Sequence, residues 1–366
     1  MNLLLINPGA SWSTIDVYRG YRDAWRRQGH TVIEYALDKR LDGAQRWLNY
    51  MWRRTQGTGR KPTTADVSYL ASFESVIKCS VYDIDWVINF SCLQFHPGVF
   101  LAMRKFGLHL AVILTESPYW DQFQKPWAAM ASVAFTNERT SVETLSKFNP
   151  RTYYLPHAYD PDRHYPGAGA DLPVPGHDVV FVGTDFPERV ELLKGVRWDG
   201  IDLGLYGNWH SLGSRSRLRR YIRGGIVDNR LAAALYQHAR IGLNMYRWKQ
   251  DWDNNKPRIY AESLNPRAVE LAACGVFTLS DYRAEVKEVF GDLIPTYGSP
   301  KELEELVRYY LAHDEERQAL AAQLPARVAD RSFDALGARI IRILEEQSKW
   351  QGTVDVSAAY SCPMTA

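Results

Sequence analysis

The chain has 366 residues, of which 46% are hydrophobic and 23% are charged, and its formal net charge at pH 7 is +2. This composition is typical of a globular protein and excludes a chain that is disordered in bulk, while the length suits two domains better than one core. A charge so close to neutral gives no reason, by itself, to expect a strongly acidic partner.

The four cysteines, Cys79, Cys92, Cys274 and Cys362, are far apart in the sequence and form no metal-type pair. We therefore expect a reduced, cytoplasmic protein. The N-terminal run MNLLLINPG lacks a basic leader and a cleavage site, and it predicts a first strand instead of a signal peptide. No apolar run approaches the roughly 20 residues that a transmembrane helix needs.

Short apolar runs alternate with amphipathic stretches along the first half of the chain. Strands are predicted at 3–7, 31–35, 86–90, 110–115 and 132–136, with helical patterns at 16–28 and 138–148. Continuous apolar strands between helices indicate a parallel sheet that is covered on both faces.

The same alternation restarts after a segment rich in proline and glycine, residues 160–178. Strands are predicted at 178–183, 201–207, 239–245 and 276–280, and helices at 187–195, 229–238, 266–274 and 300–312. The fold class that follows is α/β, with two tandem doubly wound, Rossmann-like domains facing a cleft. In such sheets ligands bind beyond the carboxyl ends of the strands, so this cleft is the expected site.

The predicted boundaries follow from these patterns. They are an N-terminal acceptor domain at 1–158, a linker at 159–177, a C-terminal donor domain at 178–331, a helix at 332–349 that returns to the first domain, and a tail at 350–366.

The stretch AESLNPRAVELAACGVF, residues 261–277, carries the strongest functional signal. Asn265 suits an N-cap, Pro266 suits the first helical position and Gly275 suits the position after the helix. The helix N-terminus favours an anion such as a phosphate. Glu262 and Glu270 flank this point, and carboxylates accept hydrogen bonds from sugar hydroxyls. The pattern favours a nucleotide sugar as ligand; the alternative is that both glutamates are solvated surface charges.

Several blocks of the second half carry a family resemblance, over roughly residues 150–345. These are the two glutamates with seven residues between them and the blocks SLNPRAVELAACGVFTLSD, FVGTDFPER, LGLYGNW, IGLNMYR and LPHAYDPDRHYP. In these blocks the sequence resembles the retaining glycosyltransferases of the GT-B fold, in particular glycosyltransferase family 4 and its CgeB-like spore-maturation branch. Over the first half the resemblance is architectural only.

The resemblance implies a nucleotide-diphosphate-sugar donor, most simply a UDP-sugar, without a metal or other cofactor. Glu262 should hold hydroxyls of the donor sugar and Glu270 those of the ribose. The backbone N–H groups of Ser263, Leu264 and Asn265 should face the diphosphate, with Arg267 also at the donor site.

A basic residue after the first strand of the second domain should neutralise the leaving group. The resemblance favours Arg189 as this residue and Lys194 as the second candidate. Both follow Gly183, which ends the strand, and the arginine of the family often lies closer to that glycine in the sequence. Arginine, lysine and a helix N-terminus can stabilise the charge that develops on a leaving diphosphate. In retaining enzymes of this fold the leaving phosphate takes the proton of the acceptor, so no protein nucleophile is expected.

Further residues are expected near the cleft. Gly9 follows the first strand, where a glycine lets backbone approach a ligand, although a plain turn explains it equally well. Tyr206, with Gly207 and Asn208, is expected to border the base, and Asn244 and Arg247 to follow another strand end.

Acidic and histidine residues in the first domain are candidates for work on the acceptor. Glu116 and Asp121 follow a buried strand, and either is the candidate general base if the reaction inverts. Family 4 enzymes often have a histidine near this point, which is absent here. His96 follows another strand end and is a rival, although a lone histidine is more often structural.

Two Asp-x-Asp pairs, Asp83/Asp85 and Asp251/Asp253, resemble metal-binding motifs of another glycosyltransferase fold. Turn and loop solvation is the favoured interpretation of both, and no metal site is predicted.

Two basic stretches, 45–62 and 214–223, suggest a polyanionic acceptor such as modified phage DNA bases or a cell-wall polymer. The alternative is that both are ordinary solvated faces.

The predicted function is therefore transfer of a sugar from a nucleotide-diphosphate-sugar to an unidentified acceptor. Two alternatives stay open. One is a non-catalytic nucleotide-sugar or glycan-binding protein on a GT-B scaffold, and the other is a GT-B sugar-nucleotide epimerase.

Overall fold

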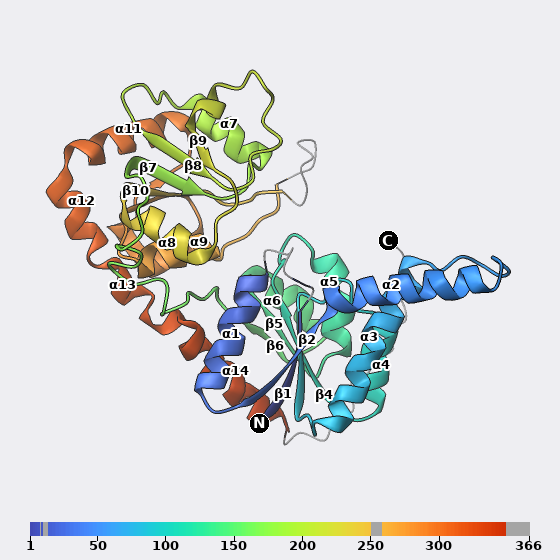
Figure 1. The fold of residues 1–366 in the computed structure, drawn as a ribbon. Helices are drawn as coiled ribbons and strands as arrows, with labels where there is room; N and C mark the ends of the chain where they lie inside the picture. The colour runs from blue at the N-terminus through green and yellow to red at the C-terminus, as the bar shows by residue number, and fades with distance from the viewer. Residues whose placement is uncertain (8, 10–13, 250–257, 349–366) are drawn as a thin grey trace. The chain divides into compact units, whose positions relative to one another are not determined.

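The computed structural model describes residues 1–7, 9, 14–249 and 258–348, which form two compact units (Figure 1). Unit 1 contains the described residues of Met1–Leu155 together with Leu336–Ser348, and unit 2 contains those of Pro156–Ala335. Each unit holds a six-stranded, all-parallel sheet flanked by helices. The predicted fold class of two Rossmann-like doubly wound domains is confirmed.

Unit 1 has the strand order β2-β1-β3-β4-β5-β6. Its strands are β1 (Asn2–Asn7), β2 (Thr31–Ala36), β3 (Trp86–Phe90), β4 (His109–Leu114), β5 (Val133–Thr136) and β6 (Thr152–Tyr154). Its helices are α1 (Ile15–Arg27), α2 (Leu37–Arg54), α3 (Thr64–Val81), α4 (Pro97–Lys105), α5 (Asp121–Met130) and α6 (Arg139–Ser146). The central strands are mainly apolar and mainly buried, as a sheet covered on both faces requires, with Asn7 and Asn89 as buried polar residues among them.

The last described helix, α14 (Phe333–Ser348), is anchored on unit 1 by two buried tryptophans. The indole N–H of Trp25 donates to the carbonyl of Gly337 at 3.1 Å, and that of Trp86 donates to the hydroxyl of Ser348 at 2.9 Å. The chain therefore leaves unit 1 after Leu155 and rejoins it at Leu336.

Unit 2 has the strand order β12-β11-β10-β7-β8-β9. Its strands are β7 (His177–Val182), β8 (Leu203–Tyr206), β9 (Ile222–Gly224), β10 (Ala239–Asn244), β11 (Thr278–Asp281) and β12 (Thr296–Tyr297). Its helices are α7 (Pro187–Gly195), α8 (Asn229–Gln237), α9 (Pro266–Ala273), α10 (Ala284–Phe290), α11 (Pro300–Ala312), α12 (Asp314–Ala321) and α13 (Leu324–Arg327), with a 3-10 helix η1 (Arg217–Tyr221).

The segment that the sequence predicts as a linker is packed onto unit 2. The side chain of Gln237 on α8 accepts from the N–H of Gly167 at 3.1 Å and donates to the carbonyl of Tyr165 at 3.3 Å. Ala168 is buried in the same apolar cluster as the residues of α8. This part of the chain therefore has fixed contacts with the domain that follows it.

The strand order of unit 2 reverses between β7 and β10. From β7 the chain moves outward to β8 and β9, and then returns to place β10 on the other side of β7. The loops after β7 and β10 therefore diverge at the carboxyl edge of the sheet, which is where doubly wound sheets bind ligands.

No helix among the described residues combines the length and the apolarity that crossing a bilayer requires.

A close backbone contact fixes the loops after β7 and β8. Gly207 has a φ of +113°, and a Cβ on it would lie 2.1 Å from the carbonyl oxygen of Gly183. We expect Gly207→Ala to lower the free energy of unfolding by about 2 kcal/mol or more, because strain and overpacking add. Urea denaturation measures this. Gly213→Ala, with open space around the new Cβ, is the control and should be near neutral; equal loss in both variants would contradict the contact.

Candidate functional site

The loop after β7 is held by backbone and side-chain hydrogen bonds. The N–H of Gly183 donates to the carbonyl of Tyr206 at 2.9 Å. The buried carboxylate of Asp185 accepts from the N–H and the hydroxyl of Ser211 at 2.7 and 2.6 Å. Sequence reasoning missed Asp185, although an acid three residues beyond a buried strand is a detectable signal. These bonds fix the start of α7, which carries Arg189.

Arg189 lies buried against two aromatic rings at this loop. Its guanidinium is 4.9 Å from the ring centroid of Phe186 and 5.5 Å from that of Phe181, and it donates to the carbonyl of Thr184 at 3.0 Å. Stacking on aromatic rings holds an arginine guanidinium in one orientation.

Arg267, on the first turn of α9, joins the two strands between which the sheet reverses. Its Nε donates to the carbonyl of Val182, the last residue of β7, at 2.7 Å, and its Nη1 donates to that of Met245, just beyond β10, at 3.3 Å. Its guanidinium also stacks on Phe181 at 4.4 Å. A Cβ on Gly183 would lie 2.4 Å from Nη2 of Arg267, so this glycine makes room for the arginine.

A cavity of about 240 Å³ opens beside these two arginines. Arg189, Arg267, Asn265 and Glu270 line it, together with Val182, Val227, Asn229, Ala232, Tyr236 and Pro266. Two cations, one carboxylate and several apolar groups therefore converge at the reversal point of the sheet. The structure brings Arg189, Asn265, Arg267 and Glu270 together as the sequence predicts.

Glu262 does not line this cavity but lies on the loop before α9. Its carboxylate accepts a hydrogen bond from the hydroxyl of Tyr260, and its carbonyl accepts from the N–H of Glu285 at 3.1 Å. A buried arginine also holds this loop in place, because the guanidinium of Arg283 donates to the carbonyl of Ser263 at 3.0 Å. Sequence reasoning missed Arg283 and Glu285, two buried charges directly after β11.

The helix N-terminus offers fewer N–H groups than the sequence suggests. Asn265 caps α9 through its side chain, which accepts from the N–H of Ala268 at 2.9 Å, and Pro266 has no N–H. The N–H of Leu264 donates at 2.6 Å to Glu285, whose carboxylate also pairs with Arg331 at 2.9 Å. This corrects the assignment of Leu264 to a diphosphate: a buried internal carboxylate already occupies that N–H.

Asp281, at the end of β11, is a buried acid near this site whose pKa is raised by burial. Burial raises its pKa to about 6, against the opposing effects of the Tyr246 N–H and the charge of Arg283. Its carboxylate accepts from the N–H of Tyr246 at 3.0 Å and from the indole of Trp248 at 3.1 Å. It therefore organises the chain that leaves β10.

The raised pKa of Asp281 predicts a pH effect on stability. The folded protein binds the proton of Asp281 more tightly than the unfolded chain does. Its contribution to the free energy of unfolding is therefore fully present at a pH below the pKa of the unfolded state, and it is lost as the pH rises through about 6. Between about pH 4 and pH 6 we expect wild type to lose on the order of 3 kcal/mol relative to Asp281→Asn. Urea denaturation across this range measures it. The exposed Asp292→Asn is the control, and parallel curves for wild type and Asp281→Asn would contradict the prediction.

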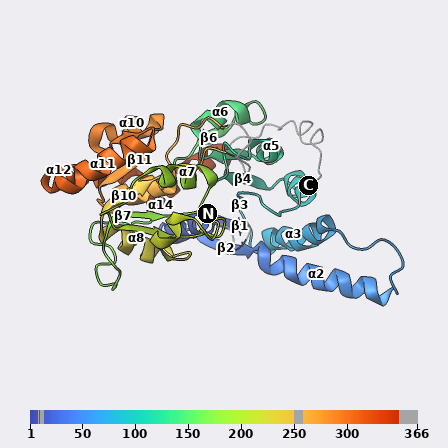
Figure 2. The same cartoon turned by 90° about the horizontal axis from the view of Figure 1, so that it is seen from above.

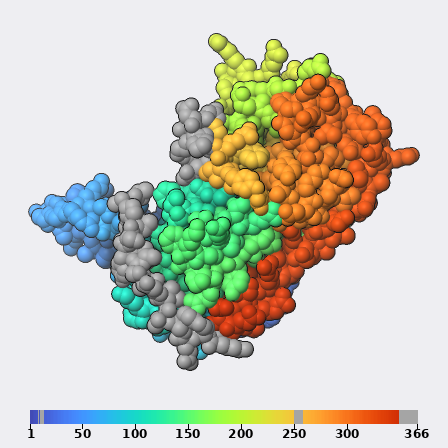
Figure 3. All heavy atoms as spheres, turned by 180° about the vertical axis from the view of Figure 1, so that it is seen from behind, coloured from blue at the N-terminus to red at the C-terminus, as the bar shows by residue number. Residues whose placement is uncertain are grey.

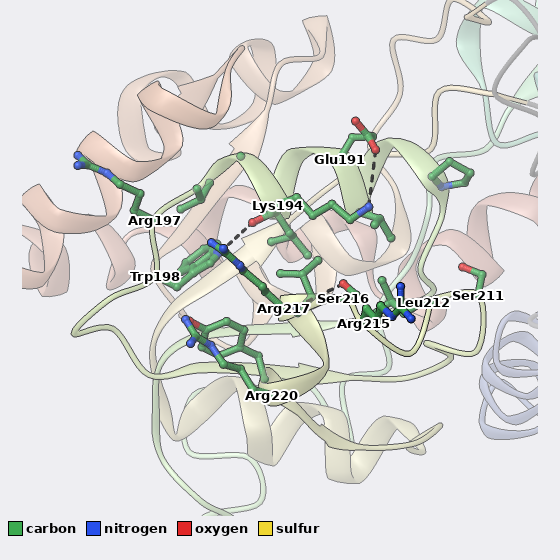
Figure 4. A pocket seen from close by; sticks show the side chains of 18 of the residues that line it. Glu191, Lys194, Arg197, Trp198, Ser211, Leu212, Arg215, Ser216, Arg217 and Arg220 are labelled. Atoms are coloured by element: carbon green, nitrogen blue, oxygen red, sulfur yellow. Dashed lines mark hydrogen bonds and ion pairs between the residues drawn. The ribbon is translucent and has the colours of Figure 1, made fainter.

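Lys194 lies in a different place from Arg189, although both are on α7. Five residues along a helix turn a side chain by about 140°. Lys194 lines a larger pocket of about 1000 Å³ between α7 and η1, together with Arg215, Arg217 and Arg220 (Figure 4). The structure therefore does not bring Lys194 to the cavity of Arg189, and its assignment to the leaving group stays a prediction.

The side chains of Tyr206 and Asn244 form hydrogen bonds with other residues of unit 2. The hydroxyl of Tyr206 lies 2.9 Å from Nε2 of His177, whose Nδ1 lies 2.7 Å from Asp202. The amide of Asn244 donates to Ser280 at 2.9 Å. Both side chains are buried, and neither lines the cavity beside Arg189 and Arg267. Their predicted contacts with a nucleotide stay predictions.

The candidates in unit 1 have structural partners of their own. A Cβ on Gly9 would lie 2.4 Å from the side chain of Asp38, so that glycine accommodates α2. His96 caps α4 by accepting from the N–H of Gly98 at 3.1 Å, and Asp121 accepts from Ser141 at 2.6 Å. Glu116 lies just after β4, where its carbonyl accepts from the N–H of Trp120 at 3.1 Å.

Unit 1 also contains a strained turn that sequence reasoning missed. Ser91, Cys92 and Gln94, directly after β3, have φ values of 55°, 58° and 61°. Positive φ at such residues is uncommon and often marks functional loops, but their sequence gives no signal of it.

Among the described residues, no group of three or more His, Cys, Asp or Glu side chains is arranged to hold a metal ion. Asp83 adopts a positive φ of 48° in a turn, as a solvated turn residue does. Asp251 and Asp253 lie outside the described residues.

The sequence is similar to one protein family and to a curated protein. Residues 188–341 match a family described as glycosyl transferase-like. The chain is 25% identical over 236 residues to spore protein CgeB of Bacillus subtilis (strain 168), which covers 63% of this chain and 73% of CgeB.

The fold is similar to solved glycosyltransferases over nearly the whole chain. Sucrose-phosphate synthase from Thermosynechococcus elongatus matches with a TM-score of 0.64 and 14% identity, covering 94% of this chain and 98% of that one. HepE of Anabaena, solved in complex with UDP-glucose, matches with a TM-score of 0.60 and 12% identity over 94% and 100% of the two chains.

Proposed function

We propose that this chain, a GT-B glycosyltransferase similar to spore protein CgeB, takes its sugar from a nucleotide-diphosphate-sugar bound at the reversal point of the unit 2 sheet. The observation that carries the proposal is the convergence of Arg189, Arg267 and Glu270 on one cavity. A UDP-sugar is the proposed donor class, and the similarity of fold to HepE with its UDP-glucose supports it.

The size and lining of the cavity suggest how a donor would divide over the site. About 240 Å³ is less than the typical small-molecule pocket, so it would hold the nucleoside and leave the diphosphate at the mouth. Glu270 would accept from the ribose hydroxyls. Arg189 would neutralise the diphosphate, and Glu262 would bind hydroxyls of the sugar beyond it.

The chemistry required of the chain is charge stabilisation. Cleavage of the anomeric bond leaves negative charge on the diphosphate, and fixed cations stabilise it without reorganising during the reaction. We propose transfer with retention and without a metal, in which the departing phosphate oxygen accepts the proton of the acceptor. A solved trehalose-6-phosphate synthase of similar fold is described as transferring with retention, which supports this choice.

The acceptor is proposed to carry phosphates or other anions. Arg215 and Arg217 are exposed in the pocket between α7 and η1, and Arg220 lies beside them, paired with Asp199 at 3.7 Å (Figure 4). Modified DNA bases and an anionic cell-wall polymer both fit this chemistry.

We also propose that the protein acts in the cytoplasm, which the free, buried thiols of Cys79, Cys92 and Cys274 support.

A ligand panel tests the donor proposal. Thermal unfolding is followed with nucleoside diphosphates and their sugars, with and without EDTA, because a ligand that binds only the folded state raises Tm. We expect a shift with uridine ligands that EDTA leaves unchanged. No shift with any nucleotide would contradict the donor site, and a shift abolished by EDTA would contradict metal independence. NMR of the anomeric product then tests retention.

A further inference from the structure

The helix α3 carries a buried apolar face and a second, largely exposed one, on which Tyr69 contacts the ring of His96 at 5.0 Å. Val67, Ala71 and Cys79 face the core and are buried. Tyr69, Phe73, Ile77 and Val81 recur every four residues and are exposed, with Ile77 54% and Val81 69% accessible. The two series are offset by two residues, or about 200°, so they lie on opposite sides of the helix. A helix that is apolar all round is normally buried.

The helix α2 extends beyond the core that supports its first half. Leu37, Ala44 and Leu48 pack into the apolar cluster of unit 1. Beyond Leu48, α2 exposes Tyr50 and Met51, after Trp47, which is 54% accessible. The hairpin of α2 and α3 (residues 37–81), here called the arm, projects from unit 1 in three views (Figures 1, 2 and 3).

The end of the arm carries five basic residues, of which Arg60 is paired with a carboxylate. Residues 45–62 contain Arg46, Arg53, Arg54, Arg60 and Lys61 and no acidic residue. Arg60 pairs with Asp66 on α3 at 2.5 Å and Arg54 lies over the ring of Tyr50 at 6.0 Å. The turn itself is ordered, since Thr63 and Asp66 form a capping box at the start of α3.

We propose that the arm docks the protein onto the surface of an anionic lipid membrane. Tryptophan, tyrosine and methionine beside arginine and lysine suit the boundary between headgroups and acyl chains, where apolar side chains insert and cations meet lipid phosphates. The proposal is independent of the donor site, because it rests on unit 1 alone.

Charge and side-chain chemistry favour this occupant over two others. A second copy of the arm would bring one basic tip against another, which costs free energy. A nucleic acid would match the charge, but it has no apolar surface for Ile77, Val81 and Leu70, which are exposed beside the aromatic rings. A lipid surface satisfies both the charge and the aliphatic side chains.

Vesicle flotation of the full chain tests the proposal. We expect binding to phosphatidylcholine vesicles with about 30% phosphatidylglycerol to be at least tenfold stronger than to phosphatidylcholine alone, and to weaken between about 0.1 M and 0.5 M salt. Trp47→Ser with Met51→Ser should reduce binding at both salt concentrations. Arg53→Glu with Arg54→Glu should abolish the preference for anionic lipid.

The matched control reverses two exposed cations elsewhere. Lys301→Glu with Arg327→Glu makes the same charge change in unit 2, away from both pockets, and should leave vesicle binding unchanged. All altered side chains are exposed, and circular dichroism checks the fold of each variant. Equal binding by the Arg53/Arg54 variant and wild type would overturn the proposal. So would a dimer in light scattering that Trp47→Ser with Met51→Ser dissociates, or binding to an oligonucleotide but not to vesicles. Because nucleotide-induced Tm shifts are measured separately, failure here leaves the donor site untouched.

Discussion

Replacing Glu262 with glutamine is expected to lower turnover about 10- to 100-fold while the affinity for free nucleoside diphosphate stays within about twofold of wild type. A carboxylate that accepts from sugar hydroxyls makes charge-assisted hydrogen bonds worth about 1.5–3 kcal/mol. Glutamine keeps the size but loses the charge and one acceptor. Glu262 lies outside the cavity of Arg189, Arg267 and Glu270, so the nucleotide contacts should persist.

Two measurements separate the roles of this carboxylate. Steady-state kinetics gives the loss in kcat, and calorimetry gives the nucleoside diphosphate affinity. Glu305→Gln, a surface carboxylate on α11 paired with Lys301 at 3.7 Å, is the matched control and should behave as wild type. Equal loss of turnover and of diphosphate affinity in Glu262→Gln would contradict a role at the sugar.

Arg189→Met is expected to weaken binding of a nucleoside diphosphate about 10- to 100-fold and to leave binding of the uncharged nucleoside unchanged. The guanidinium is buried against Phe181 and Phe186, so a charged hydrogen bond to phosphate would act in a poorly solvated site. Arg189→Lys should not restore affinity, because an ammonium neither stacks on the rings nor presents the same donors.

Calorimetry with both ligands distinguishes lost charge from a damaged fold. A misfolded site would lose nucleoside and diphosphate together, whereas a lost phosphate contact affects the diphosphate alone. Lys194→Met on the same helix is the matched control, since Lys194 faces the other pocket (Figure 4). If Lys194→Met weakened the diphosphate more than Arg189→Met did, the assignment of the cation would be reversed.

Much of the fold followed from the order of apolar runs. Strands predicted at 86–90 and 239–245 match β3 and β10 to within a residue, because a strand buried on both faces is mainly apolar and stands out as a short apolar run. The predicted helix at 187–195 is α7, residue for residue, with its proline at the start. The capped helix after Asn265 likewise appears as α9.

Four helices of unit 1, α2 to α5, were not predicted, and the sequence explains why. The helix α3 has apolar residues on two opposite faces, so it lacks the single stripe by which an amphipathic helix is recognised. The helix α5 contains Pro126, which breaks the pattern of a helix, yet the chain continues through it.

The sequence by itself determined the alternation of strand and helix, the cap of α9 and the pair Glu262 and Glu270, because these depend on neighbours along the chain. Only the tertiary structure decided which basic side chains line the same cavity. Strand order places β10 beside β7, so that Arg267 can bind the carbonyls of Val182 and Met245 at once. The turn of α7 sends Arg189 and Lys194 to different pockets, and a carboxylate from beyond β11 takes the N–H of Leu264. Such contacts join residues that are far apart in the chain, so the spacing of neighbouring residues cannot predict them.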